Sequence, residues 1–276
     1  MMKLLRIATQ NGPRWGVLDQ ERVRLAPLSA GPLAAHLHDI TRISSLISEE
    51  PLGLKFSDYK ILAPLDSPSQ FIGVGLNYRD HAIETGLPIP KAPITFGLLQ
   101  TSIIGPGDAI IIPPFASKVD WEAELGIVIG QSGTDISIDD AINYVAGYVI
   151  INDVSDRQVQ NDEGQWGRSK SFNSFKPMGP WIVTRDEIGD ASDLAIQLWV
   201  NGVLKQSSTT AELIFGVSEI VSRLSASTTL LSGSVISTGT PPGIGHSRVP
   251  PEYLNAGDEV KITIEGIGTL TNPISR

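Results

Sequence analysis

Two strongly apolar runs of the sequence contain acidic residues, and this combination limits the fold more than any other feature. The first run covers residues 119–130 and includes Glu122 and Glu124, and the second covers residues 147–155 and includes Asp153. Short apolar runs of this kind are typical of buried strands. Side chains two positions apart in a strand point to the same face of the sheet, so we expect Glu122 and Glu124 to project together.

The three carboxylates of these runs predict a metal site. A carboxylate that stays ionised in an apolar interior needs a cation beside it. Three converging oxygen ligands with open coordination positions suit Mg²⁺ or Mn²⁺ rather than zinc. The alternative is that Glu122 and Glu124 are surface acids on an edge strand and that Asp153 is unrelated to them.

The first part of the chain predicts a small separate α/β unit. Three short strands and a helix are expected, at residues 4–8, 15–18, 23–25 and 33–47. His36 and His38 are expected on the surface of this helix. Because prolines at positions 64 and 68 mark a boundary, we divide the chain into domains at residues 1–65 and 66–276.

The larger domain is rich in short strands separated by glycine and proline. Asn201-Gly202 between two apolar runs predicts a tight β-hairpin. The apolar spacing over residues 211–224 predicts a helix. Many strands and few helices indicate an α+β fold with a mainly β core.

A histidine and a glutamate form a candidate acid–base pair. Residues 77–85 can form a short helix that Gly86 ends in the left-handed conformation. On this helix His81 and Glu84 are three positions apart and face each other. A carboxylate beside an imidazole raises the basicity of the ring, as a general base requires. The alternative is an exposed helical ion pair of little energetic value.

A second helix is expected directly after Asp153, with Ser155 as its N-cap and Gln158 at the capping-box position. Arg157 and Gln160 then share a face of this helix close to the predicted metal site. There a guanidinium and an amide can hold a substrate carboxylate or keto oxygen. Alternatively, Arg157 only neutralises the acidic cluster.

Two polar segments contain candidates for stabilising negative charge. Lys170 lies in a polar loop, where its ammonium can stabilise a developing enolate if carboxylates and an anionic substrate separate it from the metal. Thr240 lies in a glycine- and proline-rich turn at residues 238–243, where its hydroxyl and neighbouring N–H groups can bind an oxyanion. The alternatives are a solvated lysine and an ordinary turn.

Together these motifs resemble the fumarylacetoacetate hydrolase family, in the branch that holds acylpyruvate hydrolases, oxaloacetate decarboxylases and hydroxymuconate isomerases. The resemblance covers residues 71–273, roughly three quarters of the chain. Five motifs occur in order and are specific as a set, namely residues 73–81, Glu122-Ala123-Glu124, Asn152-Asp153-Val154-Ser155, Lys170-Ser171-Phe172 and residues 238–243.

The resemblance implies both a fold and an activity. The fold is a folded mixed β-sheet, described as a β-sandwich roll, preceded by the small N-terminal domain. The activity is divalent-metal-dependent hydrolysis of a C–C bond in a 1,3-diketo or 2-oxo acid of the acylpyruvate type, through a stabilised enolate. The implied metal ligands are Glu122, Glu124 and Asp153, the water-activating pair is His81 and Glu84, and the substrate-binding and charge-stabilising residues are Arg157, Gln160, Thr240 and Lys170.

One position departs from the family pattern. Fumarylacetoacetate hydrolase itself has a fourth carboxylate ligand seven residues before its catalytic histidine, and Val74 stands at that position here. With one protein ligand fewer, the metal would be more open. This predicts that the substrate is a smaller 2-oxo acid and not fumarylacetoacetate itself. Oxaloacetate decarboxylation and isomerisation of hydroxymuconate or hydroxyheptadienedioate are the alternative activities, and a metal-stabilised binding protein is the non-enzymatic one.

Composition narrows the partners and the compartment. The net charge of −9 disfavours nucleic acid and anionic membranes, which both attract clustered lysine and arginine. The absence of cysteine excludes disulfides and thiolate metal sites. No apolar stretch is long enough to span a bilayer and no signal peptide is evident, so we expect a cytoplasmic protein. The family resemblance implies a homodimer.

Overall fold

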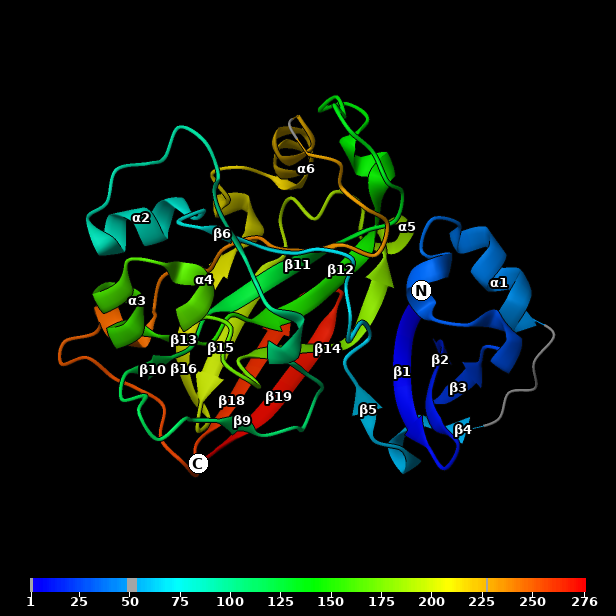
Figure 1. The fold of residues 1–276 in the computed structure, drawn as a ribbon, viewed down its shortest axis with the longest axis horizontal. Coiled ribbons are helices and arrows are strands. Elements are labelled where there is room, and N and C mark those ends of the chain that lie inside the picture. The colour runs from blue at the N-terminus through cyan, green and yellow to red at the C-terminus, as the bar shows by residue number, and fades with distance from the viewer. Residues whose placement is uncertain (1, 49–53, 227) are drawn as a thin grey trace.

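Two β-sheets form the body of the protein in the computed structural model, which describes residues 2–48, 54–226 and 228–276 (Figure 1). The larger sheet has 12 strands and the smaller has five, and a short two-stranded ladder lies beside them. Both large sheets are mixed, because β17 pairs with β6, β14 with β8 and β19 with β9 in parallel, and the other pairs are antiparallel. This architecture confirms the predicted mainly β fold.

The strands of the large sheet run in spatial order β4 (Leu54–Lys55), β3 (Arg22–Leu25), β2 (Gly12–Asp19), β1 (Lys3–Thr9), β14 (Lys176–Thr184), β12 (Val145–Asn152), β11 (Ala123–Ile129), β17 (Val235–Ser237), β6 (Phe71–Gly75) and β7 (Ile94–Gly97). Off this path, β5 (Ile61–Leu62) pairs with β1 and β8 (Ile103–Ile104) pairs with β14. The small sheet runs β16 (Val203–Thr209), β15 (Ala195–Val200), β18 (Glu259–Ile264), β19 (Gly268–Ser275) and β9 (Ile110–Ile111). The two-stranded ladder joins β10 (Val119–Asp120) and β13 (Ser155–Asp156).

The helices are short and lie around the sheets (Figure 1). They are α1 (Ile40–Ser48), α2 (Arg79–Thr85), α3 (Arg157–Glu163), α4 (Trp166–Ser169), α5 (Arg185–Ile188) and α6 (Val217–Ser225). Single 3-10 turns occur at Leu28–Ala30, Leu33–His36, Phe56–Asp58, Gln100–Ser102, Ala141–Tyr144, Thr210–Glu212 and Gly245–Ser247. None of the helices in the described part of the chain is long and apolar enough to cross a membrane.

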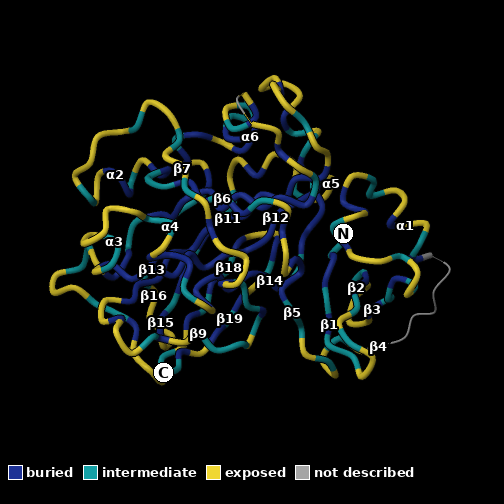
Figure 2. Tube along the Cα trace, viewed as in Figure 1, coloured by how far each residue is buried: buried dark blue, intermediate teal, exposed yellow. Residues whose placement is uncertain are grey.

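The central strands β11 and β12 are buried on both faces, as the dark trace in Figure 2 shows. In β12, Tyr148 and Ile150 join the apolar cluster that includes Ile196 of the small sheet. Their neighbours Val149 and Ile151 join a second cluster on the other side of the strand. Burial on both faces explains why these strands are continuous apolar runs rather than alternating ones.

The strands described between residues 2 and 62 extend the large sheet. Lys3 and Leu4 of β1 pair with Val183 and Ile182 of β14. In Figure 1 the blue N-terminal strands accordingly lie side by side with the body of the protein. The domain boundary near residue 65 remains a prediction.

One expectation for this region is wrong. His36 was placed on a helix surface, but its side chain is buried, stacks at 5.3 Å on the Trp15 ring and contacts the carbonyl oxygen of Ala30 through Nε2 at 2.7 Å. The expected helix is split into a 3-10 turn and α1, and this split turns His36 inward. His38 is exposed, as expected.

The predicted hairpin of the larger domain is confirmed, and the two predicted helices form over shorter ranges, α2 from Arg79 rather than 77 and α6 from Val217 rather than 211. Asn201 and Gly202 both have positive φ, 51° and 77°, which is the conformation of a two-residue hairpin turn between β15 and β16. Gly86 ends α2 with a φ of 68°, in the left-handed conformation.

Candidate active site

The strand pairing brings the three predicted acids to one place. Ala123 pairs with Asn152, so the start of β11 lies beside the end of β12. Each of Glu122, Glu124 and Asp153 offers an oxygen atom within 4.8 Å of the others, and all three residues are buried. Because β11 lies between β12 and β17, the alternative of surface acids on an edge strand is excluded.

The donor set fits a hard divalent cation. It consists of carboxylate oxygens, which Mg²⁺ and Mn²⁺ prefer. All three carboxylates line the same pocket, so their oxygens converge on a common space. Glu122, Glu124 and Asp153 are therefore the residues that would hold the ion.

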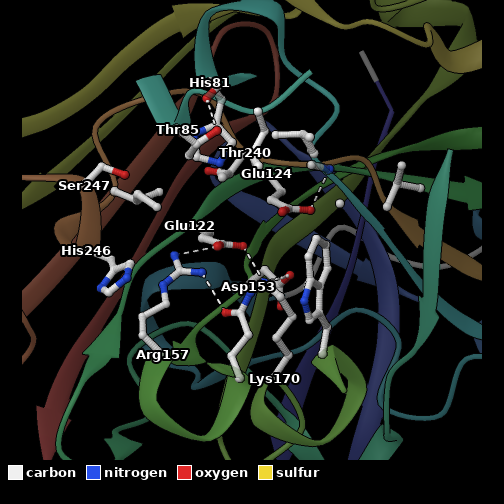
Figure 3. A pocket seen from close by; sticks show the side chains of 18 of the residues that line it. His81, Thr85, Glu122, Glu124, Asp153, Arg157, Lys170, Thr240, His246 and Ser247 are labelled. Atoms are coloured by element: carbon white, nitrogen blue, oxygen red, sulfur yellow. Dashed lines mark hydrogen bonds and ion pairs between the residues drawn. The ribbon is translucent and has the colours of Figure 1, made fainter. Parts of the chain in front are cut away.

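Two cations that the sequence placed nearby are in direct contact with these acids (Figure 3). Lys170 donates from Nζ to Glu122 Oε2 at 2.6 Å and to Asp153 Oδ2 at 2.8 Å. It is buried at the end of α4, so the alternative of a solvated surface lysine is wrong. Arg157 Nη2 lies 2.6 Å from Glu122 Oε1. Burial would raise the pKa of Glu122, but Lys170 and Arg157 outweigh it and lower that pKa to about 2.

Glu124 differs from the other two acids because no ion pair joins it to a cation among the described residues. Its Oε2 accepts hydrogen bonds from the Ser237 hydroxyl at 2.5 Å and from the Gly239 N–H at 2.9 Å. Burial, followed by the charges of Asp153 and Glu122, raises the pKa of Glu124 well above its usual range. This carboxyl is the member of the cluster that gains most from an added cation.

The predicted acid–base pair forms on α2. His81 Nδ1 lies 2.8 Å from Glu84 Oε2, and both side chains are largely shielded from solvent. Glu84 is held from its other side by the N–H of Gly243, which donates to Oε1 at 2.8 Å. The carboxylate therefore orients the ring through Nδ1 and leaves Nε2 as the nitrogen that can accept a proton.

His81 and the acids line one pocket of about 150 Å³. In Figure 3 His81 lies at one end of the labelled group and Lys170 at the other, with Glu122 between them. The remaining wall contains both polar and apolar side chains, and the apolar ones include Val74, Leu87, Phe96, Trp166 and Ile244. The pocket therefore combines titratable side chains with apolar ones, as small-molecule sites commonly do.

Glycine is required where the backbone approaches this wall. A methyl group at Gly75 would lie 2.0 Å from the Trp166 ring, and one at Gly239 would lie 2.8 Å from Asn77 Cβ. Gly239 also has a φ of 98°, which side-chain-bearing residues rarely adopt. The turn at residues 238–243 thus packs closely against Asn77, as its glycines predict. The Gly239 N–H, however, donates to Glu124 and is not free to bind an oxyanion.

Arg157 and Gln160 share a face of α3 as expected, and Arg157 Nη1 donates to Gln160 Oε1 at 3.0 Å. The predicted N-cap is wrong. Asp156 caps the helix by accepting from the Val159 N–H at 2.8 Å. Because α3 begins at Arg157, Ser155 lies one residue before the N-cap, and its hydroxyl accepts from Lys170 instead.

Thr240 lines the pocket, but its hydroxyl is already engaged. It donates to the carbonyl oxygen of Ala123 at 3.0 Å and accepts from Gln206 Nε2 at 2.9 Å. These bonds hold the turn against the start of β11. Substrate binding by Thr240 remains a prediction.

Sequence reasoning missed Asp120. Its carboxylate is fully buried and accepts from Arg157 Nε at 2.8 Å and from the N–H groups of Gly245 and His246 at 2.7 and 3.0 Å. A signal was present, because Asp120, Glu122 and Glu124 alternate in the sequence as residues on one strand face do. The side chain serves to hold Arg157 and the 3-10 turn at Gly245–Ser247 beside the pocket.

Comparisons with known proteins define the class. The C-terminal fumarylacetoacetate (FAA) hydrolase model matches residues 70–275, and the Rv2993c-like N-terminal model matches residues 2–64. The first match covers most of the chain, so this protein belongs to the fumarylacetoacetate hydrolase family.

Relatives of the whole chain include enzymes of more than one reaction type. A Burkholderia multivorans protein, named provisionally as a hydrolase, is 43% identical over 97% of this chain and 96% of its own length. A solved fumarylacetoacetate hydrolase of Exiguobacterium antarcticum is 33% identical, with a TM-score of 0.83 over 100% of this chain and 99% of its own. A solved 2-hydroxyhepta-2,4-diene-1,7-dioate isomerase of Mycobacterium marinum is 36% identical, with a TM-score of 0.82 and the same coverage.

Proposed function

We propose that this protein is a divalent-metal-dependent hydrolase that cleaves a C–C bond in a 1,3-diketo or 2-oxo acid of the acylpyruvate type. The observation that carries the proposal is one pocket in which a buried triad of carboxylates and a His–Glu pair occur together. The triad suits a metal-chelating 2-oxo acid, and the pair suits activation of water.

The triad would hold Mg²⁺ or Mn²⁺, which when bound supplies a Lewis acid that stabilises negative charge on the keto oxygens. The triad is incomplete as a cage, because the side chain of Val74, which lines the pocket, has no oxygen. This open side favours a small 2-oxo acid as the substrate.

His81 would act as the general base. Its Nε2 takes a proton from water, and the water oxygen adds to the acyl carbonyl carbon. The C–C bond then breaks, and its electron pair stays with the 2-oxo acid as an enolate that is protonated to the product. Glu84 stabilises the imidazolium formed in the first step, so the pair acts as a unit.

Four other side chains would position the substrate and stabilise charge. The Lys170 ammonium lines the pocket, donates to Glu122, Asp153 and Ser155, and would stabilise the enolate through its charge. Arg157 and Gln160 are joined on one face of α3 and would hold the substrate carboxylate. Thr240, in the turn at residues 238–243, would contact the substrate from the wall of the pocket.

Isomerisation and decarboxylation are the runner-up activities. Isomerisation has specific support, because two similar solved structures are named as isomerases. They are the M. marinum protein at 36% identity and a 5-carboxymethyl-2-hydroxymuconate delta-isomerase of Mycobacterium smegmatis at 37% identity. Decarboxylation of oxaloacetate would use the same enolate but no activated water. We favour hydrolysis because the His81–Glu84 pair is formed in the pocket.

The reaction type can be tested directly with acetylpyruvate and oxaloacetate. We expect the wild-type protein with Mn²⁺ to cleave acetylpyruvate with the higher kcat/KM. Lys170→Ala should lower turnover of both substrates by a similar factor, because both reactions generate the same enolate charge. Turnover is followed by loss of enol absorbance and by pyruvate release. Robust decarboxylation without acetylpyruvate cleavage would make the decarboxylase the better assignment.

We also propose that the protein forms a homodimer. Leu99 and Phe115 are 59% and 62% exposed and line one hollow with Phe172, and exposed apolar surface of this kind favours association. A closed two-fold dimer is the commonest soluble oligomer. Sedimentation at micromolar concentration should give twice the 29.6 kDa chain mass, and a monomer at that concentration would contradict the proposal.

A further inference from the structure

Lys176 is a buried cation that has no part in the chemistry described above. It is the first residue of β14, and its side chain is fully buried. Its ammonium donates to the carbonyl oxygens of Val154 at 3.1 Å, Phe175 at 3.0 Å and Lys170. The same Nζ lies 2.7 Å from Asp153 Oδ1 as an ion pair.

The strand register explains this contact. Ile151 of β12 pairs with Met178 of β14 in an antiparallel ladder. This is the last pair of the ladder, and Asp153 lies two residues after Ile151 while Lys176 lies two residues before Met178. The end of β12 and the start of β14 therefore bring the two side chains close together.

Lys176 is not placed to touch a substrate. It has no exposed surface and does not line the pocket. An ammonium group has three donors, and three backbone carbonyls together with the Asp153 carboxylate surround it. What it joins are two neighbours in the pocket, namely the carboxylate of Asp153 and the backbone of Lys170.

We propose that Lys176 is a positioning residue of the active site, which fixes the Asp153 carboxylate and the Lys170 backbone relative to each other. This inference rests on the proposed function, because it assigns Asp153 to the metal and Lys170 to the developing charge. Partners that orient metal-binding side chains from behind affect metal affinity or activity by 10–100-fold, as an order of magnitude.

The proposal makes a prediction of definite sign. Lys176→Met should weaken Mn²⁺ binding by roughly 10–100-fold and lower kcat by a similar factor, with KM changed much less. Simple electrostatics has the opposite effect on the metal, because removing a positive charge near three acids strengthens cation binding. Loss of orientation and loss of charge are thus distinguished by the direction of the change in Kd.

Mn²⁺ affinity is measured by calorimetry and by electron paramagnetic resonance of the free ion, on protein whose folding is verified by circular dichroism. Lys60→Met is the matched control, because Lys60 is ion-paired with Asp108 but does not line the pocket. It should leave Kd and kcat unchanged. Unchanged or tighter Mn²⁺ binding in Lys176→Met, with only the melting temperature lowered, would show a purely structural role and overturn the inference.

Two further measurements keep the result decisive. If Lys176→Met does not fold, Lys176→Gln keeps two N–H donors without the charge and should show a smaller change of the same sign. In a crystal of the unaltered protein soaked with Mn²⁺, Lys176 Nζ should remain within 4.0 Å of Asp153, and a Lys176 turned away from Asp153 would overturn the inference. Failure of wild-type protein to bind Mn²⁺ would instead remove the proposed function itself.

Discussion

Glu124→Gln is expected to abolish the response to Mn²⁺ while leaving the metal-free protein at least as stable as the wild type. Glu124 has no ion pair with a cation in the described structure, and an uncompensated buried carboxylate is costly. The amide oxygen of glutamine can still accept from Ser237 and Gly239. The melting temperature is measured by calorimetry with a chelator and then with excess Mn²⁺.

The wild-type protein should gain stability from the metal by mass action. At a free Mn²⁺ concentration of 100 times Kd, the gain is about 2.7 kcal/mol. Glu122→Ala, Glu124→Ala and Asp153→Ala should each remove this gain together with the metal-dependent activity. Glu219→Gln is a matched control, because Glu219 forms a helical ion pair with Arg223 outside the pocket. Full activity in excess chelator would contradict the metal assignment.

Asp153→Asn should behave differently from Glu124→Gln in the absence of metal. Asp153 is the buried counter-ion of both Lys170 and Lys176. Removing one partner of a buried ion pair costs about 3–5 kcal/mol because the other charge is left uncompensated. A lower melting temperature for Asp153→Asn than for Glu124→Gln, both in chelator, tests this reading of the charges.

His81→Ala should lower the turnover of acetylpyruvate by roughly 10²–10⁴-fold, the range expected for losing a general base. Mn²⁺ binding should survive, because His81 is not a ligand in the proposed site. Any decarboxylation of oxaloacetate should be affected far less, since that reaction needs no activated water. The measurement is steady-state turnover of both substrates together with Mn²⁺ affinity.

Two variants make the His81 result specific. Glu84→Gln should show a milder loss of the same kind, because the amide still accepts from Gly243 but no longer stabilises an imidazolium. His38→Ala is the matched control, since His38 is exposed and does not line the pocket. Unchanged turnover in His81→Ala would make the His81–Glu84 contact a structural ion pair.

Local spacing in the sequence was sufficient to predict those features of the site that lie within a single strand or helix. Glu122 and Glu124 project together because side chains alternate along a strand, and His81 meets Glu84 because three residues make nearly one helical turn. The Asn201-Gly202 hairpin follows from backbone preference alone. The same local rules failed at Ser155, because the helix begins one residue later than expected and Asp156 caps it.

Only the tertiary structure decided which charges meet. Lys170 and Lys176 approach Asp153 from a segment that begins 17 residues later in the chain, and no spacing rule joins them. Asp120 forms an ion pair with Arg157, which lies 37 residues later in the chain, and no spacing rule predicts this pair either. His36 is buried because the chain packs it on Trp15, although its local pattern is that of a helix surface.

The physical reason is the range of the forces involved. Alternation and helical period are properties of a single segment, so the acids and the His81–Glu84 pair can be read from the sequence. Neutralising buried carboxylates requires cations within a few ångströms, and these come from whichever strands the sheet order sets side by side. The sequence by itself therefore determined the candidate ligands and the candidate base, and the order of β14, β12 and β11 decided how their charges are balanced.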